Sequence, residues 1–325
     1  MKWHAGAVAV AAAALFLGPP AAATSKAPAA GLLPPGEALP ARTVERLLLT
    51  DAVRVEGRLV AVGERGAVLL GSLDGRSWRA ATAPPAPLLT AVRFLGAKRG
   101  WAVGHDSVIL STADGGDSWS QQFSAPKEQR PLLDVLFLDP ARGFAVGAYG
   151  AFYETADGGA SWKARPVLEE DRHLNGIVSL GEGQLLIVGE SGTLLRSEDA
   201  GRTWAPIKSP YAGSLFGAVP LAGGVVVAFG LRGRIIRSVD AGKSWALVDS
   251  PASATLMGGA VLPDGTLVLA GAAGTVVASR DAGQTFFPLA TGTSRPLAKA
   301  IAGEGGLLAF GEGGVRPVAL PSTNR

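Results

Sequence analysis

The chain of 325 residues contains no cysteine, few charged or aromatic residues, and no apolar run as long as a membrane-spanning helix needs. Without cysteine it can form neither a disulfide nor a thiolate metal site, and no lipid can be attached to a cysteine near its amino terminus. Its stability therefore has to come from a buried core. Charged residues make up 18% and aromatic residues 6% of the chain, against 45 glycines and 22 prolines. This composition favours short strands and tight turns over helices.

The balance of charge argues against a nucleic-acid partner. The chain has 30 Lys and Arg against 27 Asp and Glu, a formal net charge of +3, without the clustering of basic residues that a polyanion-binding surface requires. Histidine is scarce, since only His105 and His173 lie beyond the first few residues, and no pair of histidines has metal-ligand spacing. We expect no nucleic-acid partner, no metal and no cofactor.

The first residues have the layout of a secretory signal peptide, because Lys2 precedes the apolar run Ala5–Leu17 and small residues follow at Ala21–Ala23. A retained membrane anchor is the alternative, but the run is shorter than the roughly 20 residues of a spanning helix. An Ala- and Pro-rich stretch comes next, typical of a flexible linker. We predict a signal peptide over 1–23 cleaved near Ala23, a flexible leader over 24–38, and one domain over 39–325, exported to a periplasmic or other extracytoplasmic space.

One motif, Ser/Thr-x-Asp-x-Gly-x-Ser/Thr-Trp, returns along the chain at nearly constant intervals. Its aspartates are separated by 40, 43, 42, 41 and 41 residues, and a fixed period of this length marks a repeat fold in which each unit is one supersecondary element. The first copy is one residue short, and the last has Phe in place of Trp. These Asp motifs contain the aspartates Asp74, Asp114, Asp157, Asp199, Asp240 and Asp281, and the aromatic residues Trp78, Trp119, Trp162, Trp204, Trp245 and Phe286.

Each unit also contains short apolar runs bounded by glycine, which predict strands. In the second unit these runs are 88–94, 100–104, 107–111 and the start of a fourth at 118–120. A glycine that precedes the third strand recurs seven times, at Gly63, Gly104, Gly147, Gly189, Gly230, Gly271 and Gly311. The sequence therefore predicts an all-β, seven-bladed β-propeller of four-stranded blades.

The seven glycine landmarks exceed the six Asp motifs by one, because the last unit ends soon after Gly311 without a fourth strand. The segment Leu39–Leu47 stands before the first unit, where every other unit is preceded by a fourth strand. We predict that Leu39–Leu47 forms the outer strand of the last blade and so closes the ring, which removes an exposed sheet edge.

The residue types of the Asp motif fit a turn between the third and fourth strands of a blade. Aspartate and the hydroxyl side chains accept backbone N–H bonds, glycine supplies a positive φ, and Trp covers the turn while its indole N–H finds a partner. The alternative is a calcium loop at Asp114–Asp117. Calcium takes six to eight oxygen ligands, and this segment offers two carboxylates, so the turn is favoured.

Segments such as Gly100–Gly104 followed by Ser111–Trp119 resemble the photosystem II stability and assembly factor family of seven-bladed propellers. The similarity runs through essentially the whole mature chain, whereas the Asp motif alone, the Asp-box or BNR repeat, is shared with bacterial sialidases and other propellers. The resemblance implies an exported, non-catalytic and monomeric helper that binds a membrane protein or a membrane-protein complex and assists its assembly or stability.

A catalytic function is the alternative, namely a glycoside hydrolase of the sialidase-like Asp-box class. Such enzymes need two carboxylates facing each other across a cleft. Candidates occupy the predicted turns between second and third strands, where solvated polar residues are common: Glu64, Asp106, Glu190 and Glu312. The chain has no Gly-x-Ser-x-Gly nucleophile turn. We therefore assign no catalytic residue.

Binding surfaces are often built from loops that vary without disturbing the scaffold. Two predicted links between units, Gln121–Arg130 and Ala164–His173, are longer and more charged than the others. They are expected to lie beside the turns at Asp106 and Tyr149, which suggests a protein-binding patch with Tyr149 and Arg130 or Arg172 as anchors. The patch comprises His105, Asp106, Lys127, Arg130, Tyr149, Glu169, Asp171, Arg172 and His173. A merely solvated rim is the alternative.

Overall fold

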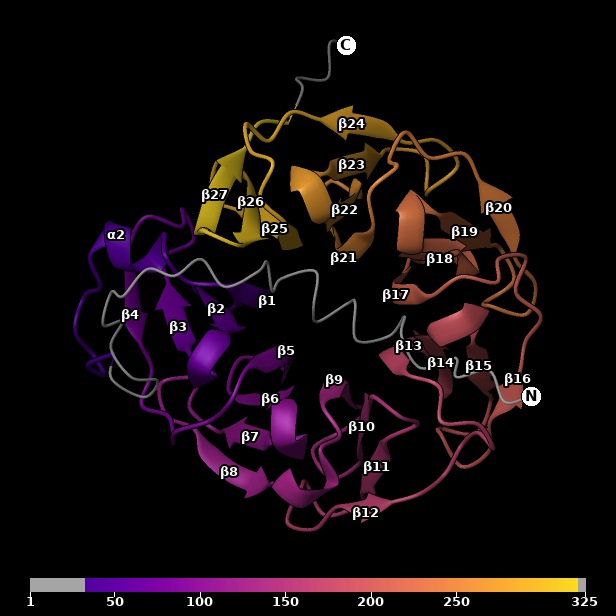
Figure 1. Cartoon of the computed structure of the whole chain (residues 1–325), viewed down its shortest axis with the longest axis horizontal. Helices are drawn as coiled ribbons and strands as arrows, with labels where there is room; N and C mark the ends of the chain where they lie inside the picture. Colours follow the sequence, from indigo (N-terminus) through magenta and orange to yellow (C-terminus); the bar gives the residue numbers. More distant parts are fainter. Residues whose placement is uncertain (1–32, 321–325) are drawn as a thin grey trace, which may run out of the picture.

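The computed structural model describes residues 33–320, and the predicted signal peptide lies outside them. Figure 1 looks along the axis of a ring of seven antiparallel sheets, each with its first strand at the centre and its last strand at the rim. The prediction of a seven-bladed β-propeller is confirmed. Among residues 33–320 no helix is long and apolar enough to cross a membrane.

The strands follow one another outward in each blade, joined by short turns. The innermost strands are β1 (Leu49–Val55), β5 (Leu89–Leu95), β9 (Leu132–Phe137), β13 (Leu174–Gly181), β17 (Leu215–Pro220), β21 (Leu256–Val261) and β25 (Leu297–Gly303). The second strands are β2 (Arg58–Gly63), β6 (Arg99–Gly104), β10 (Gly143–Gly147), β14 (Gln184–Gly189), β18 (Val226–Gly230), β22 (Leu267–Gly271) and β26 (Gly306–Gly311).

The outer half of each blade is shorter. The third strands are β3 (Val68–Gly71), β7 (Ile109–Thr112), β11 (Phe152–Thr155), β15 (Leu194–Ser197), β19 (Ile235–Ser238), β23 (Val276–Ser279) and β27 (Gly314–Val318). The fourth strands are β4 (Trp78–Ala80), β8 (Ser120–Phe123), β12 (Lys163–Ala164), β16 (Ala205–Pro206), β20 (Ala246–Val248) and β24 (Phe287–Leu289).

Buried aliphatic side chains of the second and third strands form the core between neighbouring blades. In the second blade, Val103 and Ile109 pack with Leu132 and Val135 of the third blade, and none of these four side chains is exposed. The second strands are apolar on both faces because each lies between two other sheets. This burial supplies the stability that the cysteine-free chain needs.

The last blade differs from the prediction, because its sheet has three strands, β25, β26 and β27, among the described residues. The segment Leu39–Leu47 is not its outer strand, so the closure predicted from the sequence is wrong. Ala41–Val44 forms the short helix α2. Pro40 precedes this helix, and proline starts a helix readily but offers no N–H to a strand ladder.

Residues 35–38, which the sequence placed in the flexible leader, lie along β4 of the first blade. Gly36 donates its N–H to the carbonyl of Ala80 (3.1 Å), and Leu39 donates to Trp78 (2.7 Å). The side chains of Leu39, Val44 and Leu47 then pack in a cluster shared by the first and last blades. The ordered domain therefore begins before residue 39, and its first segment covers the junction of these blades.

The junction of first and last blades is completed by the inner strands and by main-chain bonds. Gly314 donates its N–H to the carbonyl of Leu47 (2.9 Å), and Leu48 forms an isolated bridge with Glu312. On the inner strands, Lys299 lies 3.7 Å from Asp51. Side-chain packing and single bridges thus close the ring in place of an exchanged strand.

That ion pair is part of a chain of charges around the centre of the ring, in which the carboxylates are buried and the cationic side chains are partly buried. Arg93 of β5 contacts Asp51 of β1 and, at 2.8 Å, Asp134 of β9. Both carboxylates also accept main-chain bonds, from Val92 and Ile177 of the next blade. Burial would raise the pKa of Asp51, but Arg93 and Lys299 hold it below its usual value. Four blades are therefore tied together by paired charges.

Candidate functional site

The two faces of the ring are built differently. The turns between second and third strands bond to the links between blades, as when Glu190 donates its N–H to the carbonyl of His173 (2.9 Å). The Asp motifs instead bond to the turns between first and second strands, as when Ala200 donates to Gly183 (2.8 Å). We call the first the link face and the second the Asp face.

The Asp motif forms the turn between third and fourth strands, as predicted. In the fourth blade, Asp199 accepts the N–H of Thr203 (2.9 Å) and the hydroxyls of Ser197 (2.8 Å) and Thr203 (2.7 Å). The hydroxyl of Ser197 accepts the N–H of Gly201 (2.9 Å), whose φ is +85°. A β-carbon at Gly201 would lie 2.5 Å from the Phe144 ring of the preceding blade. The motif therefore needs glycine both for its turn and for blade packing.

The motif tryptophans vary in their polar contacts. The indole N–H groups of Trp78, Trp119 and Trp245 donate to the carbonyls of glycines in their own turns. The indole nitrogens of Trp162 and Trp204 are buried and have no partner among the described residues. The expectation that the indole finds a partner holds for the first three.

Both carboxylates of the segment considered as a calcium loop have protein partners. Asp114 accepts bonds from Thr112 and Ser118, which keep its pKa at about 2 although its partial burial acts in the opposite direction. Asp117 contacts Arg58 at 2.9 Å and also Arg79. Within residues 33–320 no group of three or more His, Cys, Asp or Glu side chains is placed to hold a metal ion.

The third-blade half of the predicted patch centres on Tyr149, whose side chain is 45% exposed. Its ring meets the edge of His173 at a centroid distance of 4.8 Å, and its N–H donates to Nδ1 of His173 (3.4 Å). Nδ1 also lies 3.3 Å from Glu190. Burial lowers the pKa of His173, against the pull of Glu190 and Asp171. The neutral ring is thus favoured, and it accepts the Tyr149 N–H.

The backbone of Tyr149 has a φ of +55°, which non-glycine residues seldom adopt. The same conformation recurs at equivalent turns of other blades, at Arg65, Asp106, Ser191, Arg232 and Ala273. The strain therefore belongs to the turn shape of this fold. Its effect in the third blade is to present a large aromatic side chain at the surface of the link face.

The second-blade half of the patch is held by the link that carries Lys127 and Arg130. Its turn of 3-10 helix, Pro126–Glu128, follows a bond from the N–H of Ala125 to the carbonyl of Asp106 (2.9 Å). The buried hydroxyl of Ser107 donates to the carbonyl of Arg130 (2.7 Å). Burial lowers the pKa of His105, the neighbour of Asp106. Main-chain bonds thus fix this link against the blade.

Two residues outside the predicted patch connect and order it. The hydroxyl of Tyr153 donates to Glu128 (2.7 Å), joining the second-blade link to the third blade, and burial followed by this bond raises the pKa of Tyr153 to about 12. Glu190 accepts the N–H of His173 (3.1 Å). The sequence singled out Glu190 only as a turn residue and candidate catalytic carboxylate, and nothing in it marked Tyr153.

The predicted patch residues all lie on the link face, in links or turns of the second and third blades. Most of their side chains are exposed: Asp106, Lys127, Arg130, Tyr149, Glu169 and Asp171. Those of His105, Arg172 and His173 are partly buried, and Arg172 pairs with Glu170 at 3.3 Å. The patch combines one exposed aromatic ring with charges of both signs.

The ring of seven sheets and the repeated Asp-motif turns define the chain as a seven-bladed β-propeller. Residues 122–257 match the sequence model of a family described as photosynthesis system II assembly factor YCF48. The resemblance to photosystem II assembly factor-like propellers, predicted from the repeat motifs, is confirmed. No curated protein sequence matches the chain.

Solved structures share the fold at low sequence identity. A structure titled "YCF48 bound to D1 peptide" superposes with a TM-score of 0.64 at 22% identity, covering 88% of this chain and 95% of that one. YCF48 from Cyanidioschyzon merolae gives 0.63 at 20% identity, covering 83% and 94%. A GH74 enzyme from Niastella koreensis gives 0.63 at 15% identity, covering 84% of this chain and 43% of the enzyme.

Proposed function

We propose that this propeller is an exported, non-catalytic scaffold that binds a membrane protein or membrane-protein complex and assists its assembly or stability. The observation that carries the proposal is the match of residues 122–257 to the YCF48 family model. That stretch includes Tyr149, the link Ala164–His173 and all but the first residue of the link Gln121–Arg130. The similar YCF48 structure titled as bound to a D1 peptide supports a peptide segment as the bound element.

The chemistry of the patch suits a protein partner. An exposed tyrosine supplies a large contact area at low entropic cost, and arginine offers several hydrogen-bond donors, which is why both are enriched among residues that dominate interfaces. Tyr149 is backed by His173, so its ring is held in place before binding. A pre-ordered anchor loses less conformational entropy when a partner binds.

The test replaces Arg130, Tyr149 and Arg172 by alanine together and measures membrane proteins recovered with the tagged chain after crosslinking in cell envelopes. We expect recovery of the partner to fall at least about tenfold, which corresponds to about 1.4 kcal/mol. The matched control replaces Arg202, Lys243 and Leu247, which are exposed and lie in Asp motifs or on an outer strand. Unchanged recovery with an unchanged melting temperature would refute the patch as the binding site.

Two of the carboxylates considered for glycoside hydrolysis have structural roles. Glu64 accepts the N–H of Leu48 (2.9 Å), as Glu190 accepts that of His173. Each therefore fixes the link that leads into its own blade. We expect no turnover of sialosides or β-glucans by the purified chain, and measurable hydrolysis would count against the scaffold proposal.

Export is tested separately, because it depends on residues outside the described part of the chain. The amino-terminal sequence of the protein purified from its native host should begin near Thr24. Recovery of the uncleaved chain from the cytoplasm would contradict export.

A further inference from the structure

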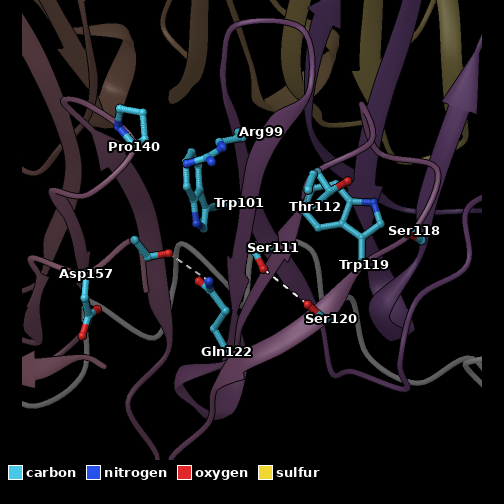
Figure 2. A pocket seen from close by; sticks show the side chains of 12 residues that line it. Arg99, Trp101, Ser111, Thr112, Ser118, Trp119, Ser120, Gln122, Pro140 and Asp157 are labelled. Carbon is cyan, nitrogen blue, oxygen red and sulfur yellow. Dashed lines mark hydrogen bonds between the residues drawn. The ribbon is translucent and has the colours of Figure 1, made fainter. Parts of the chain in front are cut away.

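Long polar side chains that span two blades on the Asp face have acceptors for their N–H groups. Arg196 of the fourth blade donates to the carbonyl of Ala241 in the fifth (2.8 Å). Figure 2 shows a similar bond between the second and third blades, from Gln122 to the carbonyl of Gly158 (3.0 Å). These donors join neighbouring blades and are already bonded.

Two arginines on the link face of the last blade have no such acceptors. Arg295 lies in the link that enters this blade, and Arg316 lies in its third strand, β27. Among the residues that the structure describes, neither guanidinium group has a hydrogen-bond or ion-pair partner. The two groups nevertheless converge, because a β-carbon at Gly313 would lie 2.7 Å from Nη1 of Arg295 and 3.3 Å from Nη2 of Arg316. Two like charges thus meet over one glycine, an arrangement that an anion between them would stabilise.

The turn at Gly313 leaves room for both arginine side chains. At this point of the turn other blades have a residue with a side chain, for example Arg65 and Tyr149. In the last blade the turn is one residue shorter, and Gly313 stands there with a φ of +89°. Gly313 is buried, and the three atoms nearest to a β-carbon built on it all belong to Arg295 and Arg316. The arginines therefore occupy the place that a turn side chain has in the other blades.

The main chain of the same turn offers a further donor. Glu312 donates its N–H to the carbonyl of Pro296 (3.0 Å), and Gly314 donates to that of Leu47 (2.9 Å). The N–H of Gly313, between them, has no acceptor within residues 33–320. Main-chain N–H groups of glycine-rich turns commonly contribute to anion sites.

The carboxylate nearest in sequence, that of Glu312, is not paired with either arginine. In the first blade the equivalent residue, Glu64, accepts the N–H of Leu48 (2.9 Å). The residue equivalent to Leu48 in the last blade is Pro296, which has no N–H to donate. The side chain of Glu312 is exposed and forms no ion pair with any described residue. Two arginines and one glutamate leave one positive charge in excess at this turn, which suits a singly charged anion.

We propose that Arg295, Arg316 and the N–H of Gly313 bind one carboxylate group. The planar guanidinium group matches a carboxylate in geometry and donates charge-assisted hydrogen bonds to it. A carboxylate carries a single charge at neutral pH, whereas a phosphate monoester carries about 1.5 to 2 charges, so the excess of one positive charge favours the carboxylate. The site lies in the last blade and shares no residue with the patch of the second and third blades, so either can fail without the other.

The test follows the amide resonance of Gly313 while acetate is added to the folded protein at constant ionic strength. We expect a saturable shift with a Kd of about 10 mM or tighter. Arg295→Gln and Arg316→Gln should each weaken binding at least about tenfold, whereas Glu312→Gln removes a competing charge and should strengthen it. The control is Arg54→Gln, at an exposed arginine of β1, which should leave the Kd unchanged.

A second probe distinguishes the source of the carboxylate, which is either a free organic acid or an acidic residue of a protein. The probe is aspartate blocked by an N-acetyl group and a carboxyl-terminal amide. Binding at least about tenfold tighter than that of acetate would assign the carboxylate to a protein partner. Equal binding of both probes would assign it to a free acid.

Three outcomes would overturn the proposal. The first is no saturable shift with either carboxylate. The second is tighter binding of inorganic phosphate than of acetate, which would indicate a phosphate ligand. The third is unchanged binding in a folded protein that carries both Arg295→Gln and Arg316→Gln, which would place the anion elsewhere. If that protein does not fold, Arg316→Lys replaces it, because lysine retains the charge without the planar fork and should still weaken binding.

Discussion

At the scale of single residues, the aspartates of the Asp motif stay ionised because N–H and hydroxyl groups of the same turn donate hydrogen bonds to their carboxylates. The bond from the Thr203 N–H, followed by that from its hydroxyl, lowers the pKa of Asp199 from 3.8 to about 2. Asp157 and Asp240 are lowered to about 2 chiefly by hydroxyl bonds from Ser161 and Ser244. The carboxylate oxygens are already hydrogen-bonded within each turn, so few of their lone pairs are free to bind a ligand.

These shifts predict how stability depends on pH. Below pH 3.8 the unfolded chain takes up protons that the folded turns still reject, so stability is full above about pH 4 and is lost as the pH falls toward 2. Urea unfolding at several pH values should show this loss, and Asp199→Asn should make it shallower. Asp249→Asn, at an exposed position outside the motifs, is the control. An equally steep loss in Asp199→Asn would contradict the role of this turn.

A glycine of an inner strand shows how closely the blades approach. A β-carbon at Gly258 would lie 2.2 Å from the carbonyl oxygen of Ala298 in the next blade. The equivalent inner-strand positions of the fourth and fifth blades are Gly176 and Gly217. The second blade has Ala91 there, and the charged residues Asp51, Asp134 and Lys299 occupy the position in the first, third and last blades. One side of the ring centre is therefore backbone, and the other carries the ion pairs.

At the scale of elements, the segment before the first blade closes the ring by packing its side chains against the first and last blades, and it adds no strand to a sheet. The side chains of Leu33, Leu39 and Leu47 are partly buried against the first and last blades, and that of Val44 is 3% exposed. Because these side chains cover the junction, the segment contributes to stability without adding to a sheet.

Truncation tests this role of the segment. A chain that starts at residue 33 should unfold like the mature protein. One that starts at residue 48 should lose about 3 kcal/mol or more of unfolding free energy, since each fully buried aliphatic side chain contributes about 1.5–3 kcal/mol. The measurement is the urea midpoint of each chain. Equal midpoints would show that the segment is dispensable for closure.

Much of this architecture could be predicted because every repeat has the same order of strand and turn signals in the sequence. The turn residues of Ser197–Trp204 and the landmark glycines are local signals, and they predicted the blades and the faces on which the turns lie. The structure of the segment Leu39–Leu47 was mispredicted because the last blade lacked a fourth strand and the segment was assigned to that position. Pro40 and the following Ala41–Val44 instead favour a helix. The expectation that every blade has four strands outweighed the local signal of Pro40.

The contacts that join the second and third blades depend on residues far apart in the sequence. The bonds from Tyr153 to Glu128 and from Gln122 to Gly158 join residues 25 and 36 positions apart. No local pattern marks such pairs, so the patch was predicted as loops without the residues that order it.

At the scale of the whole molecule, the buried charges span the blades at which the ring begins and ends. Arg93 forms ion pairs with two carboxylates, so its replacement leaves both Asp51 and Asp134 buried without their main cationic partner. Removing one partner from a buried ion pair typically costs about 3–5 kcal/mol.

Arg93→Met should therefore destabilise the ring by about 3 kcal/mol or more, measured by urea unfolding at neutral pH. Its control is Arg142→Met, which breaks an exposed pair with Asp139 and should cost well under about 1 kcal/mol. If the two variants lose the same stability, the central charges do not hold the ring together.

The rim has a consequence for how the protein behaves at high concentration. Residues 35–39 cover part of the outer edge of the first sheet. The outer strands of the other sheets could pair with another molecule, and such edges promote aggregation when they are long and flat. Here the fourth strands are two to four residues long. Proline, which interrupts pairing, occurs in β16, β24 and the three-stranded last blade, at Pro206, Pro288 and Pro317. The perimeter thus resists polymerisation, because short or proline-containing edges are poor templates for fibrils.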